Sequence, residues 1–164
     1  MTTTRIYIID TSSLIELNKH NPMDVYKTPW KMMDGLAKSG RLYAPAEVLE
    51  EIDRFDNTLA GWAKKHPEMF KDPTEEQIKI VREILKKYPS LIKKGKRYAA
   101  DPWVIALAIE MISSPQSTVV EVKRIVVTEE KIRGNRVRIP YVCKEYTVEA
   151  IDILDMFRTE GWTF

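Results

Sequence analysis

Two short apolar segments, far apart in the sequence, constrain the fold most. Residues 5–10 (Arg-Ile-Tyr-Ile-Ile-Asp) and 124–128 (Arg-Ile-Val-Val-Thr) carry apolar side chains at successive positions rather than at alternate ones. A strand of this kind is covered on both faces, which is typical of the middle of a parallel sheet. Because parallel neighbours need crossover connections that are usually helical, the two segments predict an α/β fold.

Helical and strand patterns alternate along the rest of the chain. Further strands are expected at 42–44 and, at an edge of the sheet, at 147–151. Helices are expected at 11–18, from Thr28-Pro29 to Ser39-Gly40, from Pro45 onward, at 74–88, at 101–112, from Tyr141 and from Asp152 to about Gly161. In the third of these, Val48, Ile52 and Phe55 recur at helical spacing and are predicted to face the core.

The prediction for the whole chain is one domain, residues 1–164, with a three-layer α/β/α sandwich around a parallel sheet of about four to five strands. Residues 57–97 interrupt the pattern with several Gly and Pro residues and predict a helical insertion.

Composition excludes several kinds of site and location. A lone Cys143 cannot form an intramolecular disulfide or a four-cysteine zinc site, and His20 and His66 alone cannot build an imidazole-rich metal centre. The apolar run 6–9 is far shorter than a signal-peptide core or the ~20 residues of a membrane span. With a net charge of only +2, any polyanion must be held by local patches. We therefore expect a cytoplasmic protein with no membrane partner.

Acidic residues follow both central strands. Asp10 ends the first strand, and Glu129-Glu130 come directly after the second. Ligands of an open parallel sheet bind beyond the carboxyl ends of its strands. Asp101, which starts an apolar helix, and Glu51, on the helix after the strand 42–44, can join the same edge. The sequence thus predicts a cluster of four carboxylates.

Such a cluster needs a cation. Neighbouring carboxylates raise one another's pKa, and a divalent ion removes that conflict. Oxygen ligands with little His or Cys nearby favour Mg²⁺ or Mn²⁺ over zinc. These ions activate water and stabilise charge on a phosphodiester, which indicates phosphodiester hydrolysis.

Each acid also has a purely structural explanation. Asp10 is a good cap for the helix that follows it, and Asp101 before Pro102 is a better one. Glu51 is one of many glutamates on an amphipathic helix, and Glu129-Glu130 suit a solvated loop. Only their convergence in space discriminates between the two interpretations.

Four motifs around these acids, taken in order, resemble those of PIN-domain nucleases. They are residues 8–15 (Ile-Ile-Asp-Thr-Ser-Ser-Leu-Ile), 45–51 (Pro-Ala-Glu-Val-Leu-Glu-Glu), 101–108 (Asp-Pro-Trp-Val-Ile-Ala-Leu-Ala) and 126–130 (Val-Val-Thr-Glu-Glu). The resemblance spans most of the chain, and residues 139–162 are similar to an uncharacterised bacterial and archaeal branch of that superfamily, related to VapC-type toxins.

The resemblance implies that Asp10, Glu51, Asp101 and Glu130 are the catalytic and metal-binding acids. It further implies Mg²⁺ or Mn²⁺ as cofactor, RNA as substrate and, as for many members, a co-encoded antitoxin as protein partner. A homodimer fits the family as well.

Two positions leave alternatives open. The fourth acid lies in a Glu doublet, so Glu129 is an alternative to Glu130. Glu47 and Glu50 compete with Glu51, which the spacing Pro-x-x-Val-x-x-Glu favours.

Basic runs flank the acids. Lys93, Lys94, Lys96 and Arg97 precede Asp101, and Lys131, Arg133, Arg136 and Arg138 follow Glu130. They are expected either to hold the phosphates beside a scissile bond or to be ordinary solvated loops. Base stacking is considered for Trp30, Trp62, Trp103 and Trp162, with core packing favoured for Trp103.

The function predicted from these observations is a metal-dependent endoribonuclease, with a toxin of a toxin–antitoxin pair as its setting. The alternative is a catalytically inactive PIN-like module that binds protein or RNA. An aspartyl-phosphate phosphatase is disfavoured because Ser12 stands where those enzymes carry a second Asp, and no Gly-x-Ser-x-Gly supports a serine hydrolase. Cys143 is expected to be a small core residue.

Overall fold

A parallel β-sheet forms the centre of the protein. The structure, a computed structural model, describes residues 3–92, 99–114 and 120–164. The sheet has five strands in the order β3-β2-β1-β4-β5, and every described pair is parallel. Their bounds are Thr3–Ile9 (β1), Leu42–Pro45 (β2), Phe70–Lys71 (β3), Glu121–Val127 (β4) and Glu149–Ile151 (β5). The predicted α/β sandwich is confirmed.

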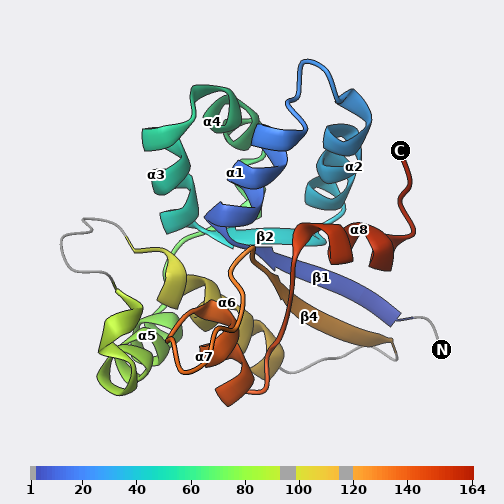
Figure 1. Ribbon diagram of the computed structural model, residues 1–164. Coiled ribbons are helices and arrows are strands. Elements are labelled where there is room, and N and C mark those ends of the chain that lie inside the picture. The colour runs from blue at the N-terminus through green and yellow to red at the C-terminus, as the bar shows by residue number, and fades with distance from the viewer. Residues whose placement is uncertain (1–2, 93–98, 115–119) are drawn as a thin grey trace.

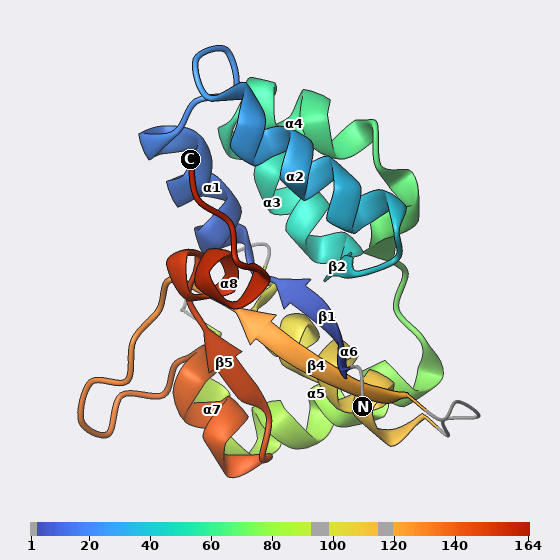
Figure 2. The same cartoon turned by 90° about the vertical axis from the view of Figure 1, so that its right-hand side faces the viewer.

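Helices cover both faces of this sheet, as Figures 1 and 2 show. In Figure 1, α1 to α4 lie above the sheet and α5 to α7 below it. The helices are α1 (Thr11–His20), α2 (Lys27–Lys38), α3 (Ala46–Phe55), α4 (Asn57–Lys64), α5 (Glu75–Lys87), α6 (Asp101–Ser113), α7 (Ile139–Glu145) and α8 (Ile153–Glu160). Short 3₁₀ turns occupy Pro67–Met69 and Pro89–Leu91. Within the described ranges, no helix combines the length and apolar character needed to cross a bilayer.

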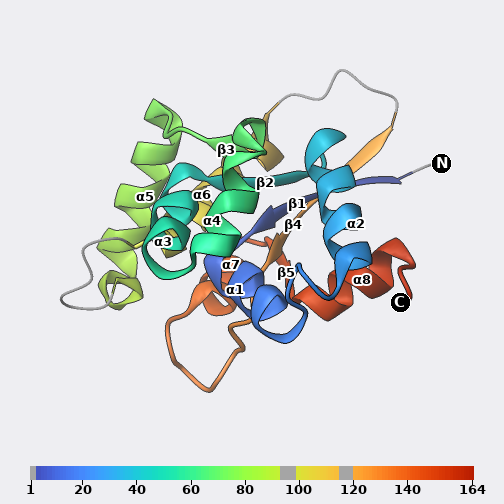
Figure 3. The same ribbon diagram turned by 90° about the horizontal axis from the view of Figure 1, so that it is seen from above.

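The two segments that predicted the sheet are its central pair. β1 and β4 are aligned along their whole length, with Ile8 opposite Val126 and Ile9 opposite Val127. All four side chains are buried, because α1 and α2 cover one face and α6 the other. The carboxyl ends of β1 and β4 therefore open at the same edge of the sheet, seen from above in Figure 3.

The helices α1 and α6 begin at the predicted residues, and the structure shows which residue caps each of them. Asp10 caps α1, as its structural explanation required, by accepting a hydrogen bond from the Thr11 backbone N–H. Asp101 is the first residue of α6 and not its cap, which is Ala100. The carboxylate of Asp101 is thus not needed as a helix cap. Thr74 caps α5 and Asp152 caps α8, which agrees with the predicted starts of these helices.

Segment 57–92 forms more than the predicted helices. It contains α4 and α5 but also β3, whose Phe70 pairs with Ala44 of β2 and so adds a strand to the sheet. A two-residue strand has no recognisable periodicity, which is why the sequence pattern missed it. The predicted basic run at residues 93–97 lies outside the described residues.

The prediction that Phe55 faces the core is wrong. Val48 and Ile52 are fully buried, whereas the Phe55 side chain is 73% exposed. Phe55 is the last residue of α3, and there the helix has passed the core and reached the wall of a cavity. Helical spacing identifies the face of a helix but not how far along its axis the core extends.

A hydrogen bond and an ion pair join α8 to the central sheet. The Glu160 carboxylate accepts hydrogen bonds from the buried Tyr7 hydroxyl and from the Arg41 guanidinium, both at 2.8 Å. Burial alone raises the Glu160 pKa, but the bonds from Arg41 and Tyr7 outweigh it and hold the pKa below its usual range.

Glu160→Gln is expected to lower the free energy of unfolding at pH 7 by on the order of 1 kcal/mol, because the charge assistance of these bonds is lost. A carboxyl with a depressed folded-state pKa contributes stability above its unfolded pKa, and loses it as the pH falls through the folded value. Urea unfolding should therefore show the difference at pH 7 and show it shrinking below about pH 4. An equal difference at both pH values would contradict this assignment.

Candidate metal centre

Three carboxylates from distant parts of the chain meet at the carboxyl edge of the sheet. Asp10 follows β1, Glu130 follows β4, and Asp101 opens α6. One oxygen from each lies within 4.8 Å of the others. In the described part of the chain, this is the one group of three or more acidic, His or Cys side chains at such spacing. The convergence predicted for these three acids is therefore present.

Asp10 is oriented by a short network of hydroxyl groups. Its Oδ1 accepts the N–H of Thr11 at 2.8 Å, and its Oδ2 accepts Ser12 Oγ at 2.8 Å and Thr128 Oγ1 at 3.0 Å. One carboxylate thus caps α1 and faces the acidic cluster at the same time. The structural interpretation of Asp10 as a helix cap is therefore confirmed, and its catalytic role stays a prediction.

Burial and repulsion raise the pKa of Asp10 to about 6. Burial is the largest cause, since the side chain is 2% exposed. The hydrogen bond from Ser12 opposes the rise, while the charges of Glu130 and Glu51 add to it. An ionised Asp10 is therefore costly unless a positive charge joins it.

Glu51 lies in the same cavity but outside the close group of three. It is 8% exposed, and its Oε1 accepts the backbone N–H of Ala100 at 2.8 Å. That bond holds the residue before Asp101, so it fixes where α6 begins. Glu51 thus positions Asp101 and adds negative charge, as its effect on the pKa of Asp10 shows.

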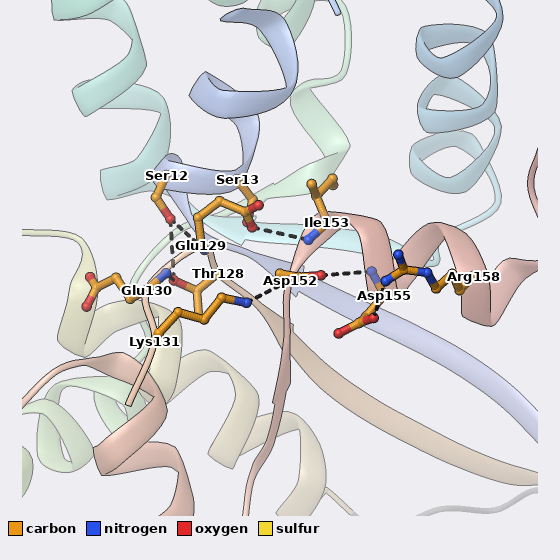
Figure 4. A network of polar contacts seen from close by, with 10 residues as sticks. All are labelled: Ser12, Ser13, Thr128, Glu129, Glu130, Lys131, Asp152, Ile153, Asp155 and Arg158. Atoms are coloured by element: carbon orange, nitrogen blue, oxygen red, sulfur yellow. Dashed lines mark hydrogen bonds and ion pairs between the residues drawn. The ribbon is translucent and has the colours of Figure 1, made fainter. Parts of the chain in front are cut away.

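The two glutamates of the doublet point in different directions (Figure 4). Glu129 Oε2 accepts Ser13 Oγ at 2.8 Å and the backbone N–H of Ile153 at 3.1 Å, so it joins α1 to α8. The Glu130 carboxylate joins Asp10 and Asp101. Of the two alternatives, Glu130 is the one placed in the cluster.

The backbone of the doublet is held by the hydroxyls that orient Asp10. Ser12 Oγ accepts the N–H of Glu129 at 3.0 Å, and Thr128 Oγ1 accepts the N–H of Glu130 at 3.2 Å. Sequence analysis did not assign Ser12 and Thr128 to the site. The available signal was their position, because each hydroxyl stands within two residues of an acid that follows a central strand.

A cavity of about 530 Å³ contains the cluster. Acidic, apolar and arginine side chains line this cavity. The lining residues are Asp10, Thr11, Ser12, Ile15, Glu51, Phe55, Ser90, Leu91, Asp101, Glu130, Arg136, Val137 and Arg138. Among the described residues, neither Arg136 nor Arg138 has an ion-pair partner. Half of the predicted second basic run therefore borders the site.

Other predicted candidates lie away from it. Lys131 pairs with Asp152 at 2.6 Å. Trp30 and Trp62 are buried, and their indole N–H groups donate to Asn21 O and Asp34 Oδ1, so neither offers a free face for a base. Cys143 is fully buried, and burial raises its pKa to about 12, which confirms a core residue rather than a nucleophile.

The donor set suits a hard divalent cation. The converging atoms are carboxylate oxygens, which are the ligands of Mg²⁺, Ca²⁺ and Mn²⁺ rather than of soft metals. Closely spaced carboxylates repel one another, and a cation bound between them relieves that repulsion. The residues present therefore fit a metal centre.

Comparison with known proteins bears on the family and the fold. A model of the family described as "Domain of unknown function (DUF4411)" matches residues 7–164. No curated protein matches the sequence. A chain of the crystal structure of VapBC2 from Rickettsia felis, bound to a DNA fragment from their promoter, has a TM-score of 0.50 and 14% identity, covering 90% of this chain and 98% of that one. At this identity the likeness shows a shared fold.

Proposed function

The chain belongs to the DUF4411 family, whose description names no activity, and we propose from the site itself that the protein is a metal-dependent endoribonuclease of the PIN type. The observation that carries the proposal is the convergence of Asp10, Asp101 and Glu130 to within 4.8 Å at the carboxyl edge of a parallel sheet. The fold shared with the VapBC2 structure supports it.

In the proposed site, Asp10, Asp101 and Glu130 hold Mg²⁺ or Mn²⁺, and Glu51 completes the negative wall. A bound divalent cation supplies an activated water and neutralises charge that develops on the scissile phosphodiester. Ser12 and Thr128 keep Asp10 in one orientation through bonds of 2.8 and 3.0 Å. The Ala100 N–H bond to Glu51 does the same for the start of α6.

The two arginines at the cavity provide the contact with the substrate backbone. Arg136 and Arg138 line the same cavity as the acids and have no ion-pair partner among the described residues. Arginine binds phosphate through two parallel hydrogen bonds. They hold phosphates beside the scissile one, without reading sequence.

We also propose that the protein acts with a protein partner of the antitoxin kind. A solved structure that shares its fold is that of VapBC2 bound to a DNA fragment from their promoter. In this setting the partner restrains cleavage, and the chain itself forms a homodimer.

The test is an assay of the purified protein on labelled single-stranded RNA. Cleavage is expected with Mn²⁺ and none with excess EDTA. Isothermal titration should show Mn²⁺ binding. If no Mn²⁺ bound at millimolar concentration, the result would instead favour the catalytically inactive binding module. That alternative has to explain a repulsive cluster that would cost stability without a cation.

A further inference from the structure

Phe55 is an exposed aromatic side chain beside the acidic cluster. It is 73% exposed, although it lies on the same helical face as the fully buried Ile52 and Val48. Single exposed apolar residues are common on proteins and need no explanation by themselves. Phe55, however, also lines the cavity that contains Asp10, Asp101 and Glu130.

The lining of the cavity combines acidic, basic and apolar side chains, and a nucleotide bound with a cation would contact all three kinds. Its acids suit a cation, its two arginines suit phosphates, and an apolar part formed by Phe55, Ile15, Leu91 and Val137 suits neither. A nucleotide joins a flat aromatic base to a phosphate through one sugar. Among the described residues that line the cavity, Phe55 is the aromatic one, so it is the side chain with a π-face to offer a base.

We propose that Phe55 stacks on one unpaired nucleobase of the RNA, next to the phosphate held at the acidic cluster. The proposal rests on the nuclease function above and adds a determinant of substrate form. A base within a duplex is already stacked between its neighbours and cannot reach a side chain in a cavity wall. Stacking on Phe55 therefore selects an unpaired base without selecting its identity.

The expected size of the effect follows from known base–aromatic contacts. Loss of one such contact weakens binding by about 5- to 150-fold. Phe55→Ala removes the ring, and Phe55→Leu keeps apolar bulk without a π-face. Phe55→Trp keeps a ring that stacks. Because the side chain is exposed, all three variants are expected to melt at the wild-type temperature.

The experiment measures fluorescence anisotropy of a dye-labelled RNA octamer, single-stranded or annealed to its complement, with each variant in EDTA. The Ala and Leu variants should bind the single strand about tenfold more weakly, and the Trp variant within about twofold of wild type. Binding of the duplex should be the same for all four proteins. Unchanged single-strand binding by Phe55→Ala would overturn the proposal, as would wild-type binding by Phe55→Leu or an equal loss with duplex.

A second arm separates this inference from the function on which it rests. With Mn²⁺ and single-stranded RNA, Phe55→Ala should raise KM about tenfold, with a smaller change in kcat. If the wild type cleaves RNA and Phe55→Ala has an unchanged KM, only the stacking inference is contradicted, and the nuclease function stands. If the wild type does not cleave RNA but its single-strand binding still depends on Phe55, only the nuclease function is contradicted, and the stacking inference stands.

Discussion

Replacing Asp10 or Asp101 by asparagine is expected to reduce Mn²⁺-dependent RNA cleavage by at least about 100-fold, which corresponds to more than about 2.7 kcal/mol of transition-state stabilisation. Each change removes one carboxylate from a group whose oxygen atoms lie within 4.8 Å of one another. Asparagine keeps the size of the side chain, and it is as good a helix cap as aspartate. The bond from the Thr11 N–H to residue 10 is therefore retained, whereas the amide nitrogen of asparagine cannot accept the two bonds that Ser12 and Thr128 donate to Asp10 Oδ2.

The measurement is kcat/KM on a labelled RNA, together with Mn²⁺ titration calorimetry. Asp53→Asn is the matched control, because Asp53 is an exposed acid on α3 that pairs only with Lys64 in the described structure and lies outside the cavity lining. It should cleave at the wild-type rate. Full cleavage by both Asp10→Asn and Asp101→Asn would rule out the proposed site.

The same variants should differ in how much Mn²⁺ raises their melting temperature. A ligand that binds only the folded state stabilises it by about 2.7 kcal/mol at a concentration of 100 times its Kd. Mn²⁺ should therefore raise the melting temperature of the wild type and of Asp53→Asn, and leave that of Asp10→Asn unchanged. A rise of equal size in Asp10→Asn would place the bound metal elsewhere.

The second large effect concerns the adjacent residues Glu129 and Glu130. One alanine variant should lose cleavage and the other should lose stability. Glu130→Ala is expected to lose Mn²⁺-dependent cleavage by about 100-fold or more while unfolding at nearly the wild-type urea concentration. The reason is that its carboxylate belongs to the acidic cluster and, among the described residues, accepts one long hydrogen bond of 3.4 Å from the Ile139 N–H.

Glu129→Ala should do the reverse. It removes the acceptor of Ser13 Oγ and of the Ile153 N–H, two bonds that join α1 to α8. Breaking hydrogen bonds to a charged acceptor costs about 1.5–3 kcal/mol, so the variant should unfold at lower urea. Cleavage per folded molecule should stay within a few-fold of wild type. If Glu129→Ala instead abolished cleavage in a stable protein, the roles of the two glutamates would be exchanged.

Motif spacing predicted the location of Glu51 but not the contacts of its side chain. The motif spacing placed it at the acidic edge, and it does line the same cavity as Asp10. Yet it is not among the three carboxylates within 4.8 Å, and its Oε1 is engaged by the Ala100 N–H. No pattern along the chain could show that bond, because residues 51 and 100 are far apart in the sequence and come together only in the folded chain.

The sequence by itself determined the architecture and the general location of the site. Successive apolar residues in β1 and β4 require a sheet covered on both faces, and an acid after each strand then lies at a shared edge. These features depend on short-range periodicity, which the order of residues contains directly. Asp10 and the Glu129-Glu130 doublet could be placed in this way.

Only the tertiary structure decided which side chains face the cavity. It turned Glu130 toward Asp10 and Asp101 and Glu129 toward α8, although the two are neighbours with the same chemistry. It also left Phe55 on the cavity wall, where the core ends before the helix does. The physical reason is that the direction of a side chain in a loop, or at the end of a helix, is determined by partners from remote segments, and local periodicity carries no information about them.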